Sequence, residues 1–160
     1  MVIKNMTYLY EAGFFDGEGS ITIQRVGRSR QAFQLEVNVA SNDKESIELY
    51  RHWGGRLHIY EAGTRQHGET GIRNARTKSY ALFFERDEAE GLLTDLLPYL
   101  RLKRKQAEIA LEFIEVYRKL SPLRFSAGRR GRPPYTGQEV KIYQSLYDKM
   151  SSLNLKAPGL

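Results

Sequence analysis

Two stretches near the start of the chain alternate between apolar and polar residues. They cover residues 20–26 and 33–40, and a Gly-Arg-Ser-Arg segment separates them. Alternation with a period of two is typical of a strand that buries one face. Glycine beside polar residues favours a turn between such strands. The pattern therefore predicts a long β-hairpin.

The pattern elsewhere predicts helices and further strands. Residues 7–16 predict a short helix, because Leu9, Ala12 and Gly13 fall on one helical face. A second helix is expected to begin at Asn42 or Asp43, either of which is a plausible N-cap. The later elements are strands over 56–60 and 73–85, helices over 87–97, 103–120 and 138–153, and a Pro/Gly/Arg linker over 121–134.

The resulting order is α-β-β-α-β-β-α with a C-terminal helical extension, which is typical of the α+β class. If both hairpins bury their apolar sides under the helices, the antiparallel sheet presents a concave polar face on its other side. We expect residues 1–120 to form the core. Residues 121–160, a basic linker and a helix, are expected to extend the same domain.

Composition narrows the class of protein. A chain of 160 residues is long enough to bury a core as one domain. It has no cysteine, which excludes disulfides and thiolate metal sites. No stretch of 18 or more apolar residues and no signal-peptide pattern is present, so we expect a soluble, intracellular protein without a membrane partner.

The charge favours a nucleic-acid partner. Lys and Arg number 25 against 19 Asp and Glu, a net charge of +6. Arg, Gln, Asn and Glu side chains read base edges, and a two-stranded ribbon fits the major groove. The side chains expected on the polar face are Thr22, Gln24, Arg28, Arg30, Gln34, Glu36, Asn38, Arg73, Thr77 and Ser79. An ordinary solvated sheet face is an equally open interpretation.

The segment Gly-Phe-Phe-Asp-Gly-Glu-Gly-Ser, residues 13–20, places two acids and closely spaced glycines where the first helix ends. Gly13 and Gly17 would allow two helices to pack closely. Two copies around a two-fold axis would bring two Glu18 carboxylates together, which repel unless divalent cations lie between them. Such oxygen ligation suits Mg²⁺ near phosphates. A helix C-cap with solvated acids is the alternative.

Residues 8–20, YLYEAGFFDGEGS, resemble the signature of the LAGLIDADG homing endonucleases, with EAGFFDGEG at its nine positions. Residues 33–40 resemble the family's second strand, and residues 98–107 resemble the start of its later helix, so the resemblance covers roughly 7–120. It implies a saddle-shaped antiparallel sheet on DNA, with helices on the other face. It also implies Mg²⁺-dependent double-strand cleavage of a long pseudo-palindromic site, in the cytoplasm or an organelle that holds the host DNA.

The resemblance also implies site residues. Glu18 matches the metal-binding acid, and the backbone carbonyl of Gly17 would be a further ligand of Mg²⁺. Mn²⁺ is an alternative metal, and Ca²⁺ is expected to support binding without efficient cleavage. Asp16 matches a second, structural acid. Lys103 matches a basic residue near the cleavage site. The alternative is that it is only one more lysine of a basic cluster. Ser41 stands where single-motif members often carry Gln and is expected to be a further catalytic residue that orders a water, although Gln has the longer reach.

The signature occurs once, because the letters YEAG at residues 60–63 lack the rest of the motif. A complete site needs two motifs, so the resemblance implies a homodimer. Its interface is expected to include Leu9, Ala12 and Gly13. Three interpretations of the partner remain: cleaved DNA, intron RNA bound by a maturase, or DNA bound by a regulator that no longer cuts. The presence of Glu18 favours cleavage.

A second basic segment lies in the predicted linker. Arg130-Gly131-Arg132-Pro133 matches the core of an AT-hook, which enters the minor groove. Phosphate contact by Arg130 and Arg132 is the simpler alternative. The histidines at 52, 58 and 67 have no metal-ligand spacing.

Overall fold

The computed structural model describes residues 2–27, 32–62, 65–68, 71–74, 77–125 and 135–155, and side chains within 8–27, 32–62, 77–121 and 135–155. The described part contains helices, strands and one 3₁₀ segment. In chain order they are α1 Val2–Glu18, β1 Gly19–Val26, β2 Ala32–Ser41, α2 Lys44–Glu48, η1 Leu49–Trp53, β3 Arg56–Tyr60, β4 Arg65–Gly68, β5 Gly71–Asn74, β6 Ser79–Phe84, α3 Arg86–Leu96, α4 Arg104–Phe125 and α5 Gly137–Leu155.

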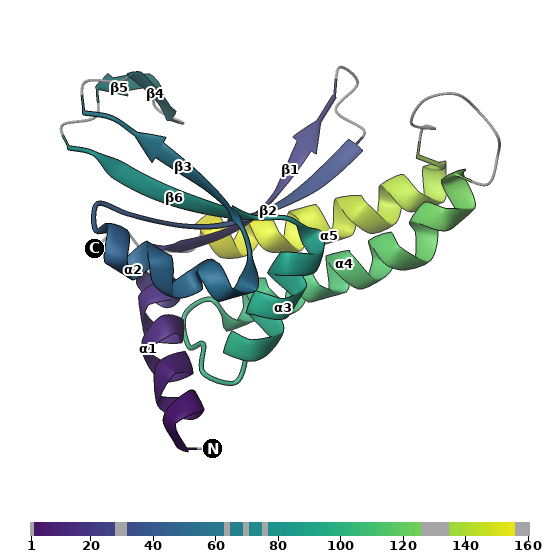
Figure 1. Ribbon diagram of the computed structural model, residues 1–160. Coiled ribbons are helices and arrows are strands. Elements are labelled where there is room, and N and C mark those ends of the chain that lie inside the picture. The colour runs from purple at the N-terminus through teal and green to yellow at the C-terminus, as the bar shows by residue number, and fades with distance from the viewer. Residues whose placement is uncertain are drawn as a thin grey trace.

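The main sheet is antiparallel, with strand order β1-β2-β6-β3. β2 pairs with β1 from Ala32 to Val39, but it pairs with β6 only from Val37 to Ser41. The first half of β2 therefore has a strand on one side only. As a result the β1–β2 and β3–β6 hairpins separate into two arms, which open like a V above the helices (Figure 1).

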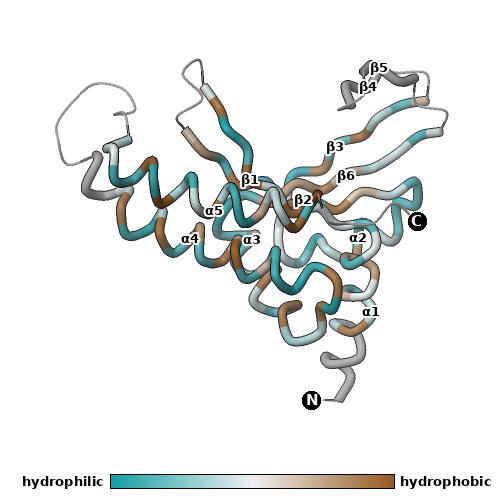
Figure 2. Tube along the Cα trace, turned by 180° about the vertical axis from the view of Figure 1, so that it is seen from behind, coloured by the Kyte–Doolittle hydropathy of each residue, from teal (hydrophilic) through white to brown (hydrophobic). Residues whose placement is uncertain are grey.

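The helices pack beneath the sheet and enclose one hydrophobic core. It contains Phe15 of α1, Val39 and Leu82 of the sheet, Leu93 of α3 and Ile114 of α4, all of which are fully buried. Hydrophobic and hydrophilic positions alternate along α4 and α5, as expected of helices with one buried face (Figure 2). Among the described residues, no helix is both long and apolar enough to cross a membrane.

The C-terminal helix α5 lies under the β1–β2 arm. The ring of its buried Tyr143 lies 6.0 Å from that of Phe33 in β2 and 5.1 Å from that of Phe113 in α4. Arg25 of β1 donates a 2.5 Å hydrogen bond to Gln144 of α5 and stacks over the Tyr147 ring at 5.0 Å. These contacts join α5 to both the sheet and α4.

The α+β class and the order of the main elements are confirmed. The first hairpin forms as the alternation predicts, and β3 spans the predicted residues 56–60. Asp43 is the N-cap of α2, and its side chain accepts a 3.0 Å hydrogen bond from the Ser46 amide. The local sequence pattern was sufficient to predict these elements, because each buries one face or satisfies the backbone hydrogen bonds of its own terminus.

Three predicted boundaries were wrong. The fourth strand is not continuous over 73–85: residues 71–74 form β5 and pair with β4 in a separate hairpin, and β6 begins at Ser79. The polar segment satisfies its backbone groups within that hairpin instead of joining the main sheet. α1 begins at Val2, well before Thr7. α4 continues through Pro122 to Phe125, because the bias against a helical residue before proline is only a preference.

Candidate active site and DNA-facing surface

The C-terminal end of α1 places an acidic residue at the base of the sheet. Glu18 is the last residue of α1, and β1 begins at the next residue, Gly19. A Cβ at Gly19 would lie 2.6 Å from both the ring and the backbone oxygen of Phe15, so only glycine fits this direct passage from helix to strand. The Glu18 side chain is exposed at that junction.

Asp16 fixes the segment before α4 against the end of α1. Its carboxylate is 9% exposed and accepts hydrogen bonds from the backbone amides of Arg101, at 2.8 Å, and Lys103, at 2.9 Å. The Lys103 amine in turn donates to the backbone carbonyl oxygen of Asp16. A cation at the C-terminal end of a helix is favourable, because the last carbonyls carry partial negative charge.

The electrostatics place Lys103 close to both acids of the motif. Partial burial lowers the pKa of the Lys103 amine, and the negative charges of Asp16 and Glu18 offset part of that effect. The end of α1 therefore combines one exposed carboxylate, one exposed glycine and one half-buried cation. This group of residues 16–18 and 103 is called the α1 terminus below.

The α1 terminus fits a hard divalent cation that takes few protein ligands. The Glu18 carboxylate has no hydrogen bond or salt bridge to any residue the structure describes. No group of three or more His, Cys, Asp or Glu side chains that could hold a metal occurs in the described part of the chain. Mg²⁺ commonly binds through one or two carboxylates and retains several waters. One chain thus offers an incomplete oxygen-only donor set, with Glu18 and the Gly17 carbonyl as its members.

Ser41 has a local partner. It ends β2 opposite Tyr80 of β6, and its hydroxyl accepts a 3.0 Å hydrogen bond from the Asp43 amide. Register places Val39 opposite Gly19, so Ser41 lies near the α1 terminus. Its hydroxyl is engaged in the turn into α2 and reaches less far than the Gln expected there.

The β1–β2 arm presents the expected polar face. Ile21, Ile23, Val37 and Val39 are buried in the core, and the intervening side chains point to the other side of the strands. Strand register sets Thr22 opposite Glu36 and Gln24 opposite Gln34. In the second arm, Leu82 and Phe84 are buried, Ser79 begins β6, and the exposed Thr77 precedes it.

Several expected DNA contacts cannot be placed. Arg28, Arg30, Arg130 and Arg132 lie outside the described residues, and for Arg73 the structure describes only its backbone in β5.

The structure shows further residues beside the polar face that the alternation did not indicate. A hollow of about 660 Å³ opens between the arms, and its lining includes Glu36, Arg56, His58 and Phe83. Phe83 breaks the apolar–polar alternation of β6, and its ring packs edge-on against His58 at 4.9 Å.

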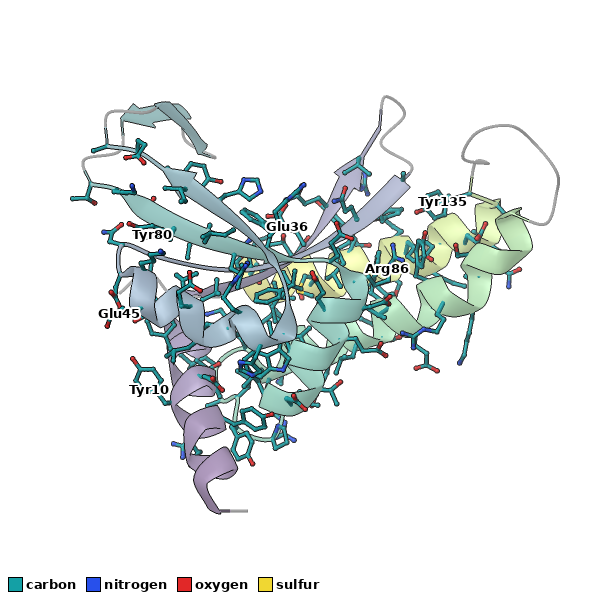
Figure 3. All side chains as sticks on the ribbon, viewed as in Figure 1. Tyr10, Glu36, Glu45, Tyr80, Arg86 and Tyr135 are labelled. Atoms are coloured by element: carbon teal, nitrogen blue, oxygen red, sulfur yellow. The ribbon has the colours of Figure 1, made fainter. Side chains whose placement is uncertain are left out.

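The exposed face of α1 differs from the one expected at the subunit interface. Leu9 and Tyr10 are 56% and 57% exposed, and Gly13 and Gly17 lie on the same side of the helix. Figure 3 shows Tyr10 projecting away from the rest of the molecule. Ala12 is fully buried in the core of its own chain. Three residues after Leu9, the turn of the helix points Ala12 toward the sheet. The exposed face therefore contains Tyr10 and Gly17 instead of Ala12.

Comparison with known proteins relates this geometry to an enzyme family. No family model matches the chain. DNA endonuclease I-CreI from Chlamydomonas reinhardtii is 30% identical over 107 residues, which are 67% of this chain and 61% of that relative. The chain thus spans less than two thirds of the curated relative's length.

Solved structures share the fold. The homing endonuclease I-CeuI, complexed with DNA, matches with a TM-score of 0.59 at 19% identity, over 91% of this chain and 66% of that chain. The homing endonuclease I-CvuI, in complex with its target, matches with a TM-score of 0.50 at 20% identity, over 94% and 98%. The signature at residues 11–19 and the similarity to I-CreI show that the chain belongs to the LAGLIDADG family of homing endonucleases, and the shared fold agrees with this.

Proposed function

We propose that this chain is a site-specific homing endonuclease that acts as a homodimer on a long pseudo-palindromic DNA site and makes a Mg²⁺-dependent double-strand break by phosphodiester hydrolysis. One observation carries the proposal: the exposed Glu18, which has no hydrogen bond or salt bridge to a described residue, ends a helix whose exposed face contains two glycines at which an added Cβ would meet nothing within 4 Å. Partners from outside the chain would account for both features: a metal ion for the carboxylate and a second helix for the glycines.

The glycines support the dimer. A Cβ at Gly13 or at Gly17 would meet nothing within 4 Å in the monomer, so alanine would fit at both positions. Glycine inside a helix costs about 1 kcal/mol relative to alanine. Close approach of a second helix is a reason to retain it, since small residues allow two backbones to come together. The exposed Leu9 and Tyr10 beside them give such a contact an apolar margin.

Pairing two α1 helices around a two-fold axis completes the metal site. Each chain contributes one Glu18 carboxylate and one Gly17 carbonyl, and the two carboxylates would repel each other without a cation between them. These groups would hold Mg²⁺, which would supply activation of water and stabilisation of the leaving oxygen of a phosphodiester. Two such sets of ligands act on the two strands of one duplex.

The neighbouring residues serve the same reaction. Asp16 positions Lys103 by accepting its backbone amide, and the Lys103 amine lies at the α1 terminus. A cation there offsets the negative charge that develops on the phosphate in the transition state. Glu18 would hold the metal.

The polar face of the two arms supplies sequence recognition. β2 has 10 residues, which at roughly 3.3 Å per residue span roughly 33 Å. Since DNA rises roughly 3.4 Å per base pair, one arm follows about ten base pairs. Two subunits therefore cover a long site with two related halves, each chain reading one half. I-CvuI, which shares the fold, was solved in complex with its target in the presence of calcium, and this supports DNA as the partner.

The test separates binding from cleavage. A duplex selected from a randomised library with the unmutated protein serves as substrate, and Glu18→Gln is compared on the same duplex. Binding in Ca²⁺ should persist, because it depends on the polar face and the phosphates. Cleavage in Mg²⁺ should fall at least a hundredfold, because the charged ligand is lost. Glu45→Gln, which removes an exposed acid from α2, is the matched control and should cut normally.

Three results would contradict the proposal. Cleavage by Glu18→Gln at the unmutated rate would show that Glu18 does not hold the metal. A single-chain mass for the active protein in solution would exclude the homodimer. Failure of the unmutated protein to cut any duplex of the library would favour a non-cleaving binder.

A further inference from the structure

Three polar side chains on the DNA-facing side of the β1–β2 arm form one hydrogen-bonded cluster. Glu36 is at its centre. The Gln24 amide nitrogen donates to Oε2 of Glu36 at 3.3 Å, and the Asn38 amide nitrogen donates to Oε1 at 3.3 Å. Gln24 is the diagonal neighbour of Glu36 on β1, and Asn38 is two residues along β2. Glu36 lies between the two arms (Figure 3), on the lining of the hollow there.

The carboxylate determines which way both amides face. An ionised carboxylate only accepts hydrogen bonds, so Gln24 and Asn38 must turn their NH₂ groups toward it. The carbonyl oxygen of each amide then points away from Glu36. The surface left over consists of the two amide oxygens, the second N–H of each amide and the free lone pairs of Glu36. These three side chains are called the acceptor cluster.

The neighbouring groups do not neutralise Glu36. Among the described residues it forms no salt bridge, and its hydrogen bonds are those from the two amides. The Thr22 hydroxyl, directly opposite Glu36 in register, is buried and has no hydrogen-bond partner, so it does not occupy a Glu36 oxygen. A carboxylate that forms no salt bridge with a described cation is unfavourable on a surface that faces phosphates unless the bound DNA offers it a donor.

Resting on the proposed function, we propose that Gln24, Glu36 and Asn38 act as one unit that reads an exocyclic amino group in the major groove, with cytosine preferred, at one base pair of each half-site. In that groove the donors are the amino groups of cytosine and adenine, whereas guanine and thymine present acceptors. Guanine or thymine would place lone pairs against the oxygens of the cluster. Cytosine and adenine instead present a hydrogen to them.

Cytosine is favoured over adenine by the neighbouring atoms. Adenine presents the N7 acceptor next to its amino group, so it is best read by an amide that offers both a donor and an acceptor. In this cluster the lone pairs of the central Glu36 carboxylate would face N7 and repel it, and Gln24 and Asn38 each already use one N–H group on Glu36. Cytosine has no acceptor beside its amino group on the groove edge, which suits the Glu36 carboxylate because that group only accepts.

The experiment measures base preference, position by position, with Glu36→Gln. Binding of randomised duplexes is measured in Ca²⁺ for the unmutated protein and the variant. The cytosine preference should weaken about tenfold at one position of each half-site and stay unchanged elsewhere, since a glutamine can turn a donor toward the base. Gln24→Ala and Asn38→Ala should weaken the preference at the same position, because each releases one oxygen of Glu36. Glu45→Gln should change no position.

The outcomes separate this inference from the proposed function. If Glu36→Gln folds, binds and cuts with an unchanged base preference, the acceptor cluster does not read DNA, although the enzyme remains an endonuclease. If Gln24→Ala and Asn38→Ala relax different positions from Glu36→Gln, the three side chains read separately and the inference fails. If the unmutated protein binds no duplex, both proposals fail together.

Discussion

The Asp16 carboxylate at the end of α1 accepts a 2.9 Å hydrogen bond from the backbone amide of Lys103, which lies 87 residues further along the chain. The Lys103 amine donates to the Asp16 carbonyl oxygen in the opposite direction. This reciprocal pair fixes the start of α4 against the helix that carries Glu18. Asp16 thereby determines where the cation of Lys103 lies relative to Glu18.

Asp16→Asn tests this positioning. An asparagine keeps the shape but replaces a charged acceptor with a neutral amide, and its NH₂ group must face one of the two backbone amides. We expect the free energy of unfolding to fall by about 1–3 kcal/mol and cleavage to fall more than DNA binding. Urea unfolding, together with cleavage and binding on one duplex, measures all three. Glu18→Gln should leave the free energy of unfolding unchanged, and equal losses of binding and cleavage in Asp16→Asn would contradict a positioning role.

Lys103→Met tests whether Lys103 acts at the scissile phosphate. Methionine is unbranched like lysine but has no charge, so the offset of transition-state charge is lost. Cleavage should fall at least tenfold with little change in DNA affinity. Lys105→Met removes an exposed lysine from the same basic cluster and is the matched control. If both variants lose the same activity, Lys103 is only one more charge of that cluster.

Gly13→Leu tests the helix pairing. A Cβ at Gly13 meets nothing in the monomer, so the variant should fold and gain helix propensity. A leucine would separate two paired α1 helices, so sedimentation should show a folded monomer that does not cleave. Gly19→Ala should instead destabilise the fold itself, because its Cβ would lie 2.6 Å from Phe15. A Gly13→Leu protein that remains a dimer would place the interface elsewhere.

Glu11 predicts a pH-dependent stability. It is 1% exposed, and its Oε2 atom has no hydrogen-bond partner in the described structure. Burial, with a smaller contribution from the charge of Asp95 on α3, raises the pKa of Glu11 to about 7. The folded state therefore binds the proton more tightly than the unfolded chain, in which a glutamate titrates near about 4.3. The free energy of unfolding should fall as pH rises from about 4.3 to about 7.

The measurement is urea unfolding at pH 5 and pH 8 for the unmutated protein and for Glu11→Leu. Leucine has no proton to release, so the loss of stability at pH 8 should be smaller in the variant. Glu11→Gln, which is also neutral at both values, should resemble the leucine variant in its pH dependence. An equal loss in all three proteins would assign the effect to other groups.

Local sequence was sufficient for elements that satisfy their own physical requirements. The alternation of residues 20–26 and 33–40 predicts β1 and β2, because a strand with one apolar face can bury only that face. The N-cap at Asp43 bonds within its own turn. The signature at residues 11–19 likewise indicated the family from the letters alone, and with it Glu18 as the residue to test.

Only the tertiary structure decided what depends on residues far apart in the chain. The small size of Ala12 fits either a partner helix or the chain's own core, and the orientation of α1 on the sheet buried it in the core. Strand register placed Gln24 within reach of Glu36, and folding joined Asp16 to Lys103 across 87 residues. Spacing along the chain carries no information on such contacts, because loop closure and packing determine which distant groups meet.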